Sequence, residues 1–360
     1  MKPKVLIIQE YIPHYRVPIF NLLSEKVDLS LIYSEGEKPI GVKFDLQYIP
    51  KKELSIHILG RCVKRYYSSK SYYKIAKNYD VVICIAKFDW LDIFLLQHLP
   101  HRYKLLYWGI GVAATYEVNY DSDSRVSEMI YKHIKSSDGM IFYSDYPVQK
   151  YMNMGIDKSK LFVANNTVEV IKTSYSSAGR NKILFVGTLY KAKKLEVLIE
   201  AYHNAYLKNN NIPDLVIVGD GRERTFYEKM VKDYKLDYKI TFVGKIIDER
   251  ILCDYFSQAI MCVSPNQAGL SVLKSMGYGV PYVTHEHAIT GGEIFNIHNH
   301  VDGVLLNDFS ELESIILEAG ENPEKFYRMG ETAYDYYYDN RRPQDMVNGF
   351  VAAINSVTNK

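Results

Sequence analysis

The chain has 360 residues, of which 47% are hydrophobic, and this supplies apolar material for two cores of ordinary size. Its formal net charge of +2 at pH 7, with no recognition motif, argues against nucleic-acid binding. The four cysteines form no CxxC pair, which argues against a disulfide framework or a zinc site.

The charge is unevenly divided. Residues 1–176 carry 24 Lys and Arg against 18 Asp and Glu, whereas the remaining residues carry 20 against 24. A basic front half either favours an anionic substrate or membrane surface or has no functional meaning. The first apolar run begins at Val5 and ends by Gln9, too short for a signal peptide or a membrane span, so we expect a cytoplasmic protein.

Short, nearly continuous apolar runs alternate with helix-length segments along the whole chain. Such runs are typical of parallel strands that are buried on both faces. The first series is KVLIIQ at 4, VDLSLIY at 27, DVVICIA at 80, YKLLYW at 103, DGMIFYS at 138 and KLFVA at 160. The second series is KILFVG at 182, DLVIVG at 214, KITFVG at 239, AIMCVS at 259 and VPYVT at 280. Helical segments at 193–208 and 223–235 separate strands of the second series, so the sequence predicts two doubly wound α/β lobes.

A polar connector and a broken helix complete this organisation. Apolar periodicity stops within 168–181, where Ser, Gly and Arg predominate, so we place a linker at 171–181. Residues 334–354 indicate a helix that is interrupted at Arg341, Arg342 and Pro343 and then resumes. Basic and aromatic residues gather at 61–77, where they suit a membrane interface, a sugar-phosphate acceptor, or simply a helix packed on the first lobe.

Glycine-containing loops follow several strands of the second series. In SPNQAGLSVLKSMGYGVP at 264–281, Gly269 opens an apolar-periodic helix that closes at Gly277 or Gly279. The free N–H groups at its start favour an anion such as a nucleotide diphosphate. In GTLYKAKK at 187–194, a lysine at 193 or 194 begins the next helix and would neutralise phosphate charge. GDGRER at 219–224 and GKI at 244–246 have the same form and would meet at the carboxyl edge of the sheet.

With these motifs the chain resembles family 4 of the retaining glycosyltransferases, over nearly its whole length. The resemblance rests on FVGTLYKAKKLEVLIEA, VIVGDGRER and VSPNQAGLSVLKSMGYGVPYVT, and it implies the GT-B fold of two Rossmann-like lobes with a cleft between them. It further implies an acceptor-side lobe at 1–170, a donor-binding lobe at 182–335, and a kinked helix at 336–360 that crosses back to the first lobe.

The same resemblance assigns roles to individual residues. It implies that Gly187 and Lys193 contact the donor diphosphate, and that Gly269, Leu270 and Ser271 meet it at the helix start. Weaker counterparts are Gly221 and Arg222. The loops YIPHYRVPIFNLL at 11–23 and YWGIG at 107–111, with Gly109 and Gly111, are similar to the acceptor-facing loops of that family.

Three positions depart from the family pattern. The family's arginine beside the first glycine is Thr188, and its pair of glutamates eight residues apart is Asn266 and Lys274. The second glutamate accepts hydrogen bonds from the donor ribose, whereas a lysine has only donors. Lys274 therefore reaches a donor phosphate or pairs with a nearby carboxylate, and Asn266 or Gln267 remains able to bind a sugar hydroxyl.

Replacement acid–base groups have to come from elsewhere. In ITGGEIFNI at 289–297, Gly291 and Gly292 permit a tight loop that aims Glu293 at the cleft, or Glu293 is a surface residue after a turn. In the first lobe, His14 or His133 would position or deprotonate an acceptor hydroxyl, although a lone histidine is more often structural. Arg16 would bind an acceptor phosphate in a bidentate manner.

No cofactor or metal is expected, because lysine and a helix start serve the leaving diphosphate and Asp121 and Asp123 lie in a polar loop. The leading hypothesis is a glycosyltransferase that moves a sugar from a UDP- or GDP-sugar to a glycan or lipid-linked acceptor in cell-surface polysaccharide synthesis. Such a protein would contact the inner face of the membrane peripherally. The alternatives are a catalytically impaired homologue that binds glycans or a partner, and a nucleotide-sugar epimerase.

Overall fold

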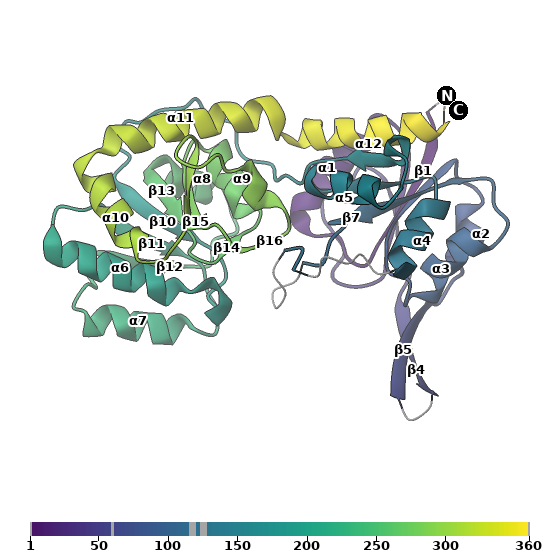
Figure 1. Cartoon of the computed structure of the whole chain (residues 1–360), viewed down its shortest axis with the longest axis horizontal. Coiled ribbons are helices and arrows are strands. Elements are labelled where there is room, and N and C mark those ends of the chain that lie inside the picture. The colour runs from purple at the N-terminus through teal and green to yellow at the C-terminus, as the bar shows by residue number, and fades with distance from the viewer. Residues whose placement is uncertain (1, 59–60, 115–119, 123–127, 359–360) are drawn as a thin grey trace. The chain divides into compact units, whose positions relative to one another are not determined.

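The computed structural model describes residues 2–58, 61–114, 120–122 and 128–358, and for residues 56–58 and 61–63 it describes the backbone alone. Within these residues the chain divides into two compact units (Figure 1). Unit 1 comprises residues 1–113, 123–166 and 343–360, and unit 2 comprises residues 114–122 and 167–342. Each unit is a parallel sheet covered by helices, as the alternation of apolar runs and helical segments predicts.

Unit 1 contains a seven-stranded parallel sheet of order β3-β2-β1-β6-β7-β8-β9. Its strands are β1 (Lys4–Gln9), β2 (Asp28–Tyr33), β3 (Asp45–Tyr48), β6 (Val81–Ile85), β7 (Lys104–Gly109), β8 (Gly139–Phe142) and β9 (Leu161–Val163). All of the predicted strands of the first series are confirmed, and β3 was not predicted. Strand β3 is half-exposed at the edge of the sheet, so it lacks the continuous apolar run that identifies a buried strand.

Helices cover both faces of this sheet. Alternate residues of β1 enter two separate cores, Val5 and Ile7 one of them, Leu6 and Ile8 the other. The first core is closed by α1 (Val17–Ser24) and α12 (Pro343–Thr358). The second core is closed by α2 (Tyr72–Ala76), α3 (Leu91–His98), α4 (Glu128–Ser136) and α5 (Tyr146–Asn153). The 3₁₀ helices η1 (His14–Arg16) and η2 (Lys158–Lys160) lie in the connecting segments.

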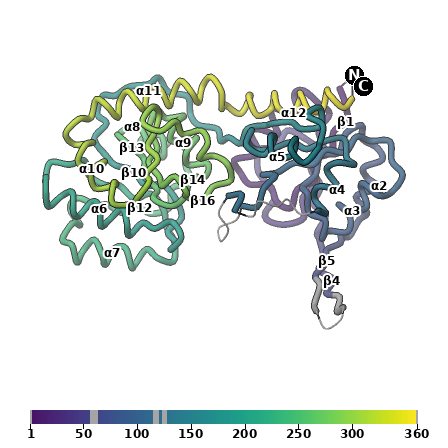
Figure 2. Tube along the Cα trace, in the orientation of Figure 1, coloured from purple at the N-terminus to yellow at the C-terminus, as the bar shows by residue number. Residues whose placement is uncertain are grey.

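One of the alternatives left open for 61–77, a helix packed on the first lobe, is wrong for most of that segment, because its first part forms a β-hairpin with the preceding residues. Strands β4 (Lys51–Ile58) and β5 (Arg61–Ser68) pair antiparallel with each other and extend away from the rest of unit 1, as Figures 1 and 2 show. Only Tyr72–Ala76 is helical. The physical reason is that tyrosine and valine favour strands, and that β4, the partner strand, was not recognised in the sequence.

Unit 2 contains a six-stranded parallel sheet of order β12-β11-β10-β13-β15-β17, the strand order of a doubly wound nucleotide-binding fold. Its strands are β10 (Lys182–Val186), β11 (Asp214–Val218), β12 (Ile240–Gly244), β13 (Ala259–Val263), β15 (Tyr282–His285) and β17 (Gly303–Leu306). The predicted strands of the second series are confirmed. Two short strands, β14 (Gln267–Ala268) and β16 (Ile289–Thr290), pair beside the main sheet.

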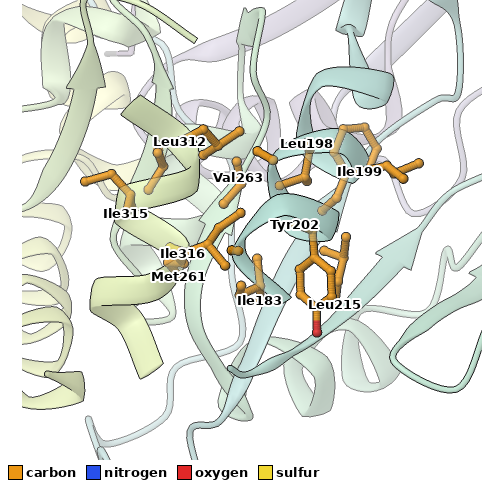
Figure 3. Close-up of a cluster of buried hydrophobic side chains, with 14 of the residues drawn as sticks. Ile183, Leu198, Ile199, Tyr202, Leu215, Met261, Val263, Leu312, Ile315 and Ile316 are labelled. Atoms are coloured by element: carbon orange, nitrogen blue, oxygen red, sulfur yellow. The ribbon is translucent and has the colours of Figure 1, made fainter. Parts of the chain in front are cut away.

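A hydrophobic core of unit 2 lies on one face of this sheet (Figure 3). Ile183 and Leu215 of the sheet pack there against Leu198 and Tyr202 of α6 and Ile316 of α10. The helices of unit 2 are α6 (Leu195–Lys208), α7 (Arg224–Asp233), α8 (Glu249–Ser257), α9 (Ser271–Gly277), α10 (Glu311–Glu321) and α11 (Pro323–Asn340), with the 3₁₀ helices η3 (Lys191–Lys193) and η4 (Glu293–Asn296). The helices predicted at 193–208 and 223–235 correspond to α6 and α7.

The predicted linker and the predicted broken helix have defined positions. Residues 171–181 lie in unit 2, where Arg180 is buried and donates hydrogen bonds to the carbonyl oxygens of Ala259 (2.9 Å) and Tyr278 (2.8 Å). The interruption at 341–342 separates α11, which packs in unit 2, from α12, which packs in unit 1. Pro343 begins α12, where its missing N–H has no cost.

Candidate donor-binding site

Glycines at the carboxyl edge of the unit 2 sheet let its loops pack directly against one another. The amide of Gly187 donates to Val218 O (2.9 Å), and the amide of Gly219 donates to Gly244 O (2.8 Å). A Cβ atom on Gly219 would overlap the Gly187 carbonyl oxygen, and one on Gly221 would overlap the Leu189 carbonyl oxygen. These positions therefore require glycine for backbone contact, so the glycine at 221 is explained by packing alone.

Lys193 is the principal charged group among these loops. It ends η3, its side chain is only 7% exposed, and its Nζ lies over Gly187, where a Cβ would collide with it. Among the residues that the structure describes, no carboxylate or hydrogen-bond acceptor is recorded for this ammonium, although its Nζ lies 5.6 Å from the Phe185 ring centroid. Burial lowers the pKa of Lys193 to about 8.

An isolated buried ammonium is costly, so this lysine is not the ordinary solvated side chain that its sequence also allowed. The sequence left open whether Lys193 or Lys194 is the functional lysine. Lys194 is half-exposed, adopts a left-handed backbone conformation (φ 53°), and lies over the Phe309 ring instead. The structure therefore singles out Lys193.

The loop after β13 is fastened to the loop that carries Lys193. Asn266 Nδ2 donates to Ala192 O (2.9 Å), and the Tyr190 hydroxyl donates to Gln267 Oε1 (2.9 Å). Both amide side chains are half-buried. Asn266, Gln267 and Lys193 are thus brought together at one edge of the sheet. Tyr190 was not predicted, because a tyrosine within a lysine-rich loop has no distinguishing pattern.

The start of α9 has no side-chain cap and has free space beside Gly269. Leu270 is the N-cap residue of this helix but provides no side-chain cap, and a Cβ atom on Gly269 would find nothing within 4 Å. Ser271 Oγ lies 2.8 Å from the Tyr282 hydroxyl, which donates to Gln267 O (2.9 Å). The first N–H groups of a helix have no intrahelical acceptor. Among the described residues no backbone acceptor is recorded for the N–H groups of Gly269, Leu270 and Ser271, so these groups are available to a ligand.

Lys274 pairs with a carboxylate, the second of the two possibilities that the sequence left open. Its Nζ donates to Glu249 Oε2 (2.6 Å), and the Tyr278 hydroxyl donates to Glu249 Oε1 (2.7 Å). Glu249 is the first residue of α8, and the side chains of Lys274 and Glu249 are 17% and 32% exposed. The charge of Lys274 is therefore already matched within unit 2.

Glu293 lies buried at the start of η4, with a side chain that turns back on its own loop. Its Oε2 accepts from the Gly291 amide (2.9 Å), while Thr290 Oγ1 accepts from the amides of Gly292 (3.1 Å) and Ile294 (3.2 Å). Gly292 has φ 114°, so the tight Gly-Gly loop that was predicted is present. The surface interpretation of Glu293 is wrong, because the residue is only 6% exposed.

Two residues that were expected to contact the donor, Thr188 and Arg222, are exposed. Thr188 is exposed beside Gly187, and the side chain of Arg222 is 80% exposed, 4.0 Å from Glu223. Neither side chain is held toward Lys193 by a recorded contact. Among the described residues, no three His, Cys, Asp or Glu side chains gather as a metal site would require. Asp121 is described, with φ 53°, whereas Asp123 lies outside the described residues.

In unit 1, Arg16 is a buried structural residue. Its Nη2 donates to Asn166 Oδ1 (2.5 Å), its Nη1 donates to Met346 Sδ (3.0 Å), and its guanidinium lies 5.1 Å from the Trp108 ring centroid and 5.2 Å from that of Tyr143. With 5% exposure it ties α12 to the sheet of unit 1. This geometry does not match the prediction that Arg16 binds an acceptor phosphate in a bidentate manner.

The other candidate acceptor-site residues of unit 1 lie on different elements. His14 is exposed, whereas His133 is buried in α4, where its Nδ1 lies 2.7 Å from Met129 O and its ring stacks on Phe88. Gly109 ends β7, and Gly111 has φ 82°. A Cβ on Gly111 would meet the Phe142 ring at 2.5 Å, so this glycine is needed for packing.

The strand order and the strand-end loops give unit 2 a doubly wound α/β fold. Residues 180–322, which lie in unit 2, match the family model described as glycosyl transferases group 1. The uncharacterized glycosyltransferase MJ1069 of Methanocaldococcus jannaschii is 26% identical over 212 residues, which are 58% of this chain. The match spans about half the length of that relative.

Solved structures resemble the chain over nearly its whole length. The Anabaena protein Alr3699/HepE in complex with UDP and glucose matches with a TM-score of 0.69 and 13% identity, covering 98% of this chain and all of the other. The pneumococcal O-GlcNAc transferase GtfA in complex with UDP and GlcNAc matches with a TM-score of 0.70 and 11% identity, covering both chains fully. The expected GT-B fold and the resemblance to glycosyltransferases are confirmed, while membership of family 4 stays a prediction.

Proposed function

We propose that this protein transfers a sugar from a nucleotide-sugar donor, preferably a UDP-sugar, to a saccharide acceptor. The observation that carries this proposal is the buried Lys193 ammonium, which has no recorded carboxylate partner among the described residues and belongs to a loop that Asn266, in the segment before α9, holds by a hydrogen bond to Ala192 O. A donor diphosphate would supply a negatively charged partner for this lysine. The UDP-bound relatives favour uridine over guanosine.

In this proposal Lys193 stabilises the leaving group. As the bond between the anomeric carbon and the diphosphate breaks, the electron pair of that bond passes to a phosphate oxygen. The oxygen of the acceptor hydroxyl forms the new bond to the anomeric carbon, and its proton passes to the departing diphosphate. A fixed ammonium and the N–H groups of Leu270 and Ser271 would meet the developing charge without reorganisation. The tie between Asn266 and Ala192 O holds the lysine loop in place for this purpose.

The remaining details are also proposals. We propose retention of anomeric configuration, an acceptor that is a glycan or a lipid-linked saccharide, and a role in cell-surface polysaccharide synthesis at the inner face of the membrane. None of the described helices is long and apolar enough to cross a membrane. Membrane contact would therefore be peripheral.

The test is a donor panel with a matched pair of lysine variants. UDP and GDP release would be measured with several sugars on each nucleotide and with saccharide acceptors. We expect Lys193→Ala to lower kcat by about 10² to 10³. Lys191→Ala, which removes an exposed lysine from the same 3₁₀ helix, should keep the activity of the parent protein.

Two results would contradict the proposal. Folded protein that binds UDP but turns over no donor would favour the alternative of a binding protein, which the absence of carboxylates at positions 266 and 274 supports. Conversion of a nucleotide-sugar to its epimer without an acceptor would favour an epimerase.

A further inference from the structure

The β4–β5 hairpin of unit 1 is built as a fixed projection. The Tyr66 amide donates to Asp89 O (3.0 Å), the Ser68 amide donates to Asp92 Oδ2 (2.6 Å), and Trp90 Nε1 donates to Ser68 Oγ (3.0 Å). Trp90 and Asp92 are buried. Because an isolated two-stranded hairpin is marginal in water, these contacts at its base hold it in a defined direction.

One face of the hairpin is satisfied by its own contacts. The register pairs Glu53 with Tyr66 and Ser55 with Lys64. On this face Lys64 Nζ lies 3.0 Å from Glu53 Oε1, and Ser55 Oγ donates to the same carboxylate (3.2 Å). Nearer the base, Lys51 forms ion pairs with Glu10 and Glu35 and lies over the Tyr66 ring.

The opposite face is exposed and its charges are unmatched. The register pairs Lys52 with Tyr67 and Leu54 with Arg65, so these four side chains share one face. Leu54 is 49% exposed and Tyr67 is 39% exposed. Lys52 and Arg65 are exposed, and no carboxylate partner is recorded for either among the described residues. We call Lys52, Leu54, Arg65 and Tyr67 the open face.

We propose that the open face of the hairpin binds the surface of a membrane that contains anionic lipids. The charge is complementary, since the two cations of the open face, Lys52 and Arg65, are exposed and have no recorded carboxylate partner among the described residues, whereas Lys51 and Lys64 are already ion-paired. Cations beside a leucine and a tyrosine match a bilayer interface, where phosphates attract the charges while the apolar and aromatic side chains enter the headgroup region. A polyanion in solution would leave Leu54 and Tyr67 exposed.

This inference deepens the peripheral membrane contact proposed above, and it can be tested separately from the transfer reaction because the test measures binding to vesicles and requires no donor. The full chain would be floated with vesicles of phosphatidylcholine containing about one third phosphatidylglycerol, and with vesicles of phosphatidylcholine alone. We expect binding to the anionic vesicles that weakens as salt increases, because salt screens exposed charges.

Charge-matched variants locate the surface. Lys52→Glu with Arg65→Glu should reduce the anionic vesicle partition by more than about tenfold. Lys229→Glu with Lys232→Glu makes the same change in net charge at exposed positions of α7 and should leave the partition unchanged. Leu54→Ser with Tyr67→Ser should also weaken binding, and the weakening should persist at low salt because those side chains are uncharged. Circular dichroism and thermal unfolding would establish that all variants fold.

Three results would overturn the proposal. The parent protein would fail to bind anionic vesicles, or the α7 control would lose binding as strongly as the hairpin variant. Alternatively, light scattering would show an oligomer of the parent protein that the hairpin variants convert to a monomer, in which case a second copy of the chain occupies the open face.

Discussion

Lys274 Nζ lies 2.6 Å from Glu249 Oε2, so the lysine that stands in place of an expected glutamate is bound to a carboxylate from another helix. The Tyr278 hydroxyl holds the second oxygen of the same carboxylate. Glu249 was not predicted, because it is 25 residues from Lys274 in the chain and no local pattern links the two. The pair allows the role of Lys274 to be tested directly.

Lys274→Ala should lower the free energy of unfolding by about 1 kcal/mol, because a partly buried ion pair lies between an exposed pair and a buried charged hydrogen bond in strength. UDP affinity should stay within about threefold of the parent value, since Glu249 already uses this charge. Urea unfolding and calorimetric titration would measure the two effects. Lys274→Glu, which would approach the family pattern, should destabilise more by placing two carboxylates together.

Glu249→Gln provides the control for this pair. In a double-mutant cycle with Lys274→Ala, the loss of stability should be less than additive, because both changes remove one interaction. A fall in UDP affinity of more than about tenfold with unchanged stability would instead place Lys274 on a donor phosphate.

Lys193 should make stability depend on pH in a predictable direction. Burial lowers its pKa from 10.5 to about 8 in the folded protein. Below pH 8 the lysine is protonated in both states, and the folded state bears the whole cost of a buried charge. Between about pH 8 and 10.5 the unfolded state binds a proton that the folded state lacks, so unfolding becomes less favourable as pH rises, by up to about 3 kcal/mol.

Lys193→Met isolates this effect, because it removes the ammonium and keeps much of the volume. The difference in unfolding free energy between Lys193→Met and the parent protein should favour the variant at pH 7.5 to 8 and shrink toward pH 10. UDP binding near pH 9 should take up protons in the parent protein alone, as calorimetry in two buffers would measure. A constant difference across this range would contradict burial of the charge.

Three glycine-to-alanine changes should separate packing from ligand binding. Gly269→Ala places its Cβ in open space, so stability should be unchanged while UDP affinity falls if the diphosphate approaches this backbone. Gly187→Ala should displace the Lys193 ammonium and strain the backbone at φ 158°, so both activity and stability should fall. Gly219→Ala meets the Gly187 carbonyl oxygen, which cannot move freely, and should prevent stable folding. UDP titrations and thermal unfolding would distinguish the three, and equal UDP affinity in Gly269→Ala would move the diphosphate away from the start of α9.

Glu293 allows a test of position against catalysis. Because its carboxylate accepts a hydrogen bond from Gly291 N, Glu293→Ala should cost about 1 to 3 kcal/mol of stability. Glu293→Gln retains an oxygen acceptor and should keep turnover within about tenfold of the parent. A loss of about a hundredfold in kcat with unchanged urea unfolding would support the hypothesis of a catalytic acid.

Arg16→Lys should destabilise the protein by about 1 to 3 kcal/mol, because lysine cannot reproduce the planar group that contacts Asn166 and Met346 between aromatic rings. Asn166→Ala should lose less and should not add fully to Arg16→Lys. Urea unfolding measures both variants. Unchanged stability together with weaker acceptor binding would return Arg16 to the acceptor site.

Features that depend on residues close together in the sequence could be predicted from it, whereas features that depend on contacts between distant residues could not. Strands such as β1 and β10 were predictable because burial on both faces leaves a continuous apolar run in the sequence itself. The β4–β5 hairpin could not be predicted, because each of its strands is stabilised by the other strand and by Trp90 and Asp92. The donor loop could be located from Gly269, but the partner of Glu293 could not, because it depends on the direction of one tight turn.

The sequence by itself determined the two doubly wound lobes, their strand segments and the glycine-rich edge of the second sheet, because all of these follow from local hydrophobic periodicity and local backbone freedom. Only the tertiary structure decided that Lys193 is buried with no recorded carboxylate partner among the residues it describes, while Lys274 is matched by Glu249. Burial and charge pairing depend on which distant segments pack together. Two lysines that look alike in a sequence therefore differ in the free energy of their charged forms once the chain has folded.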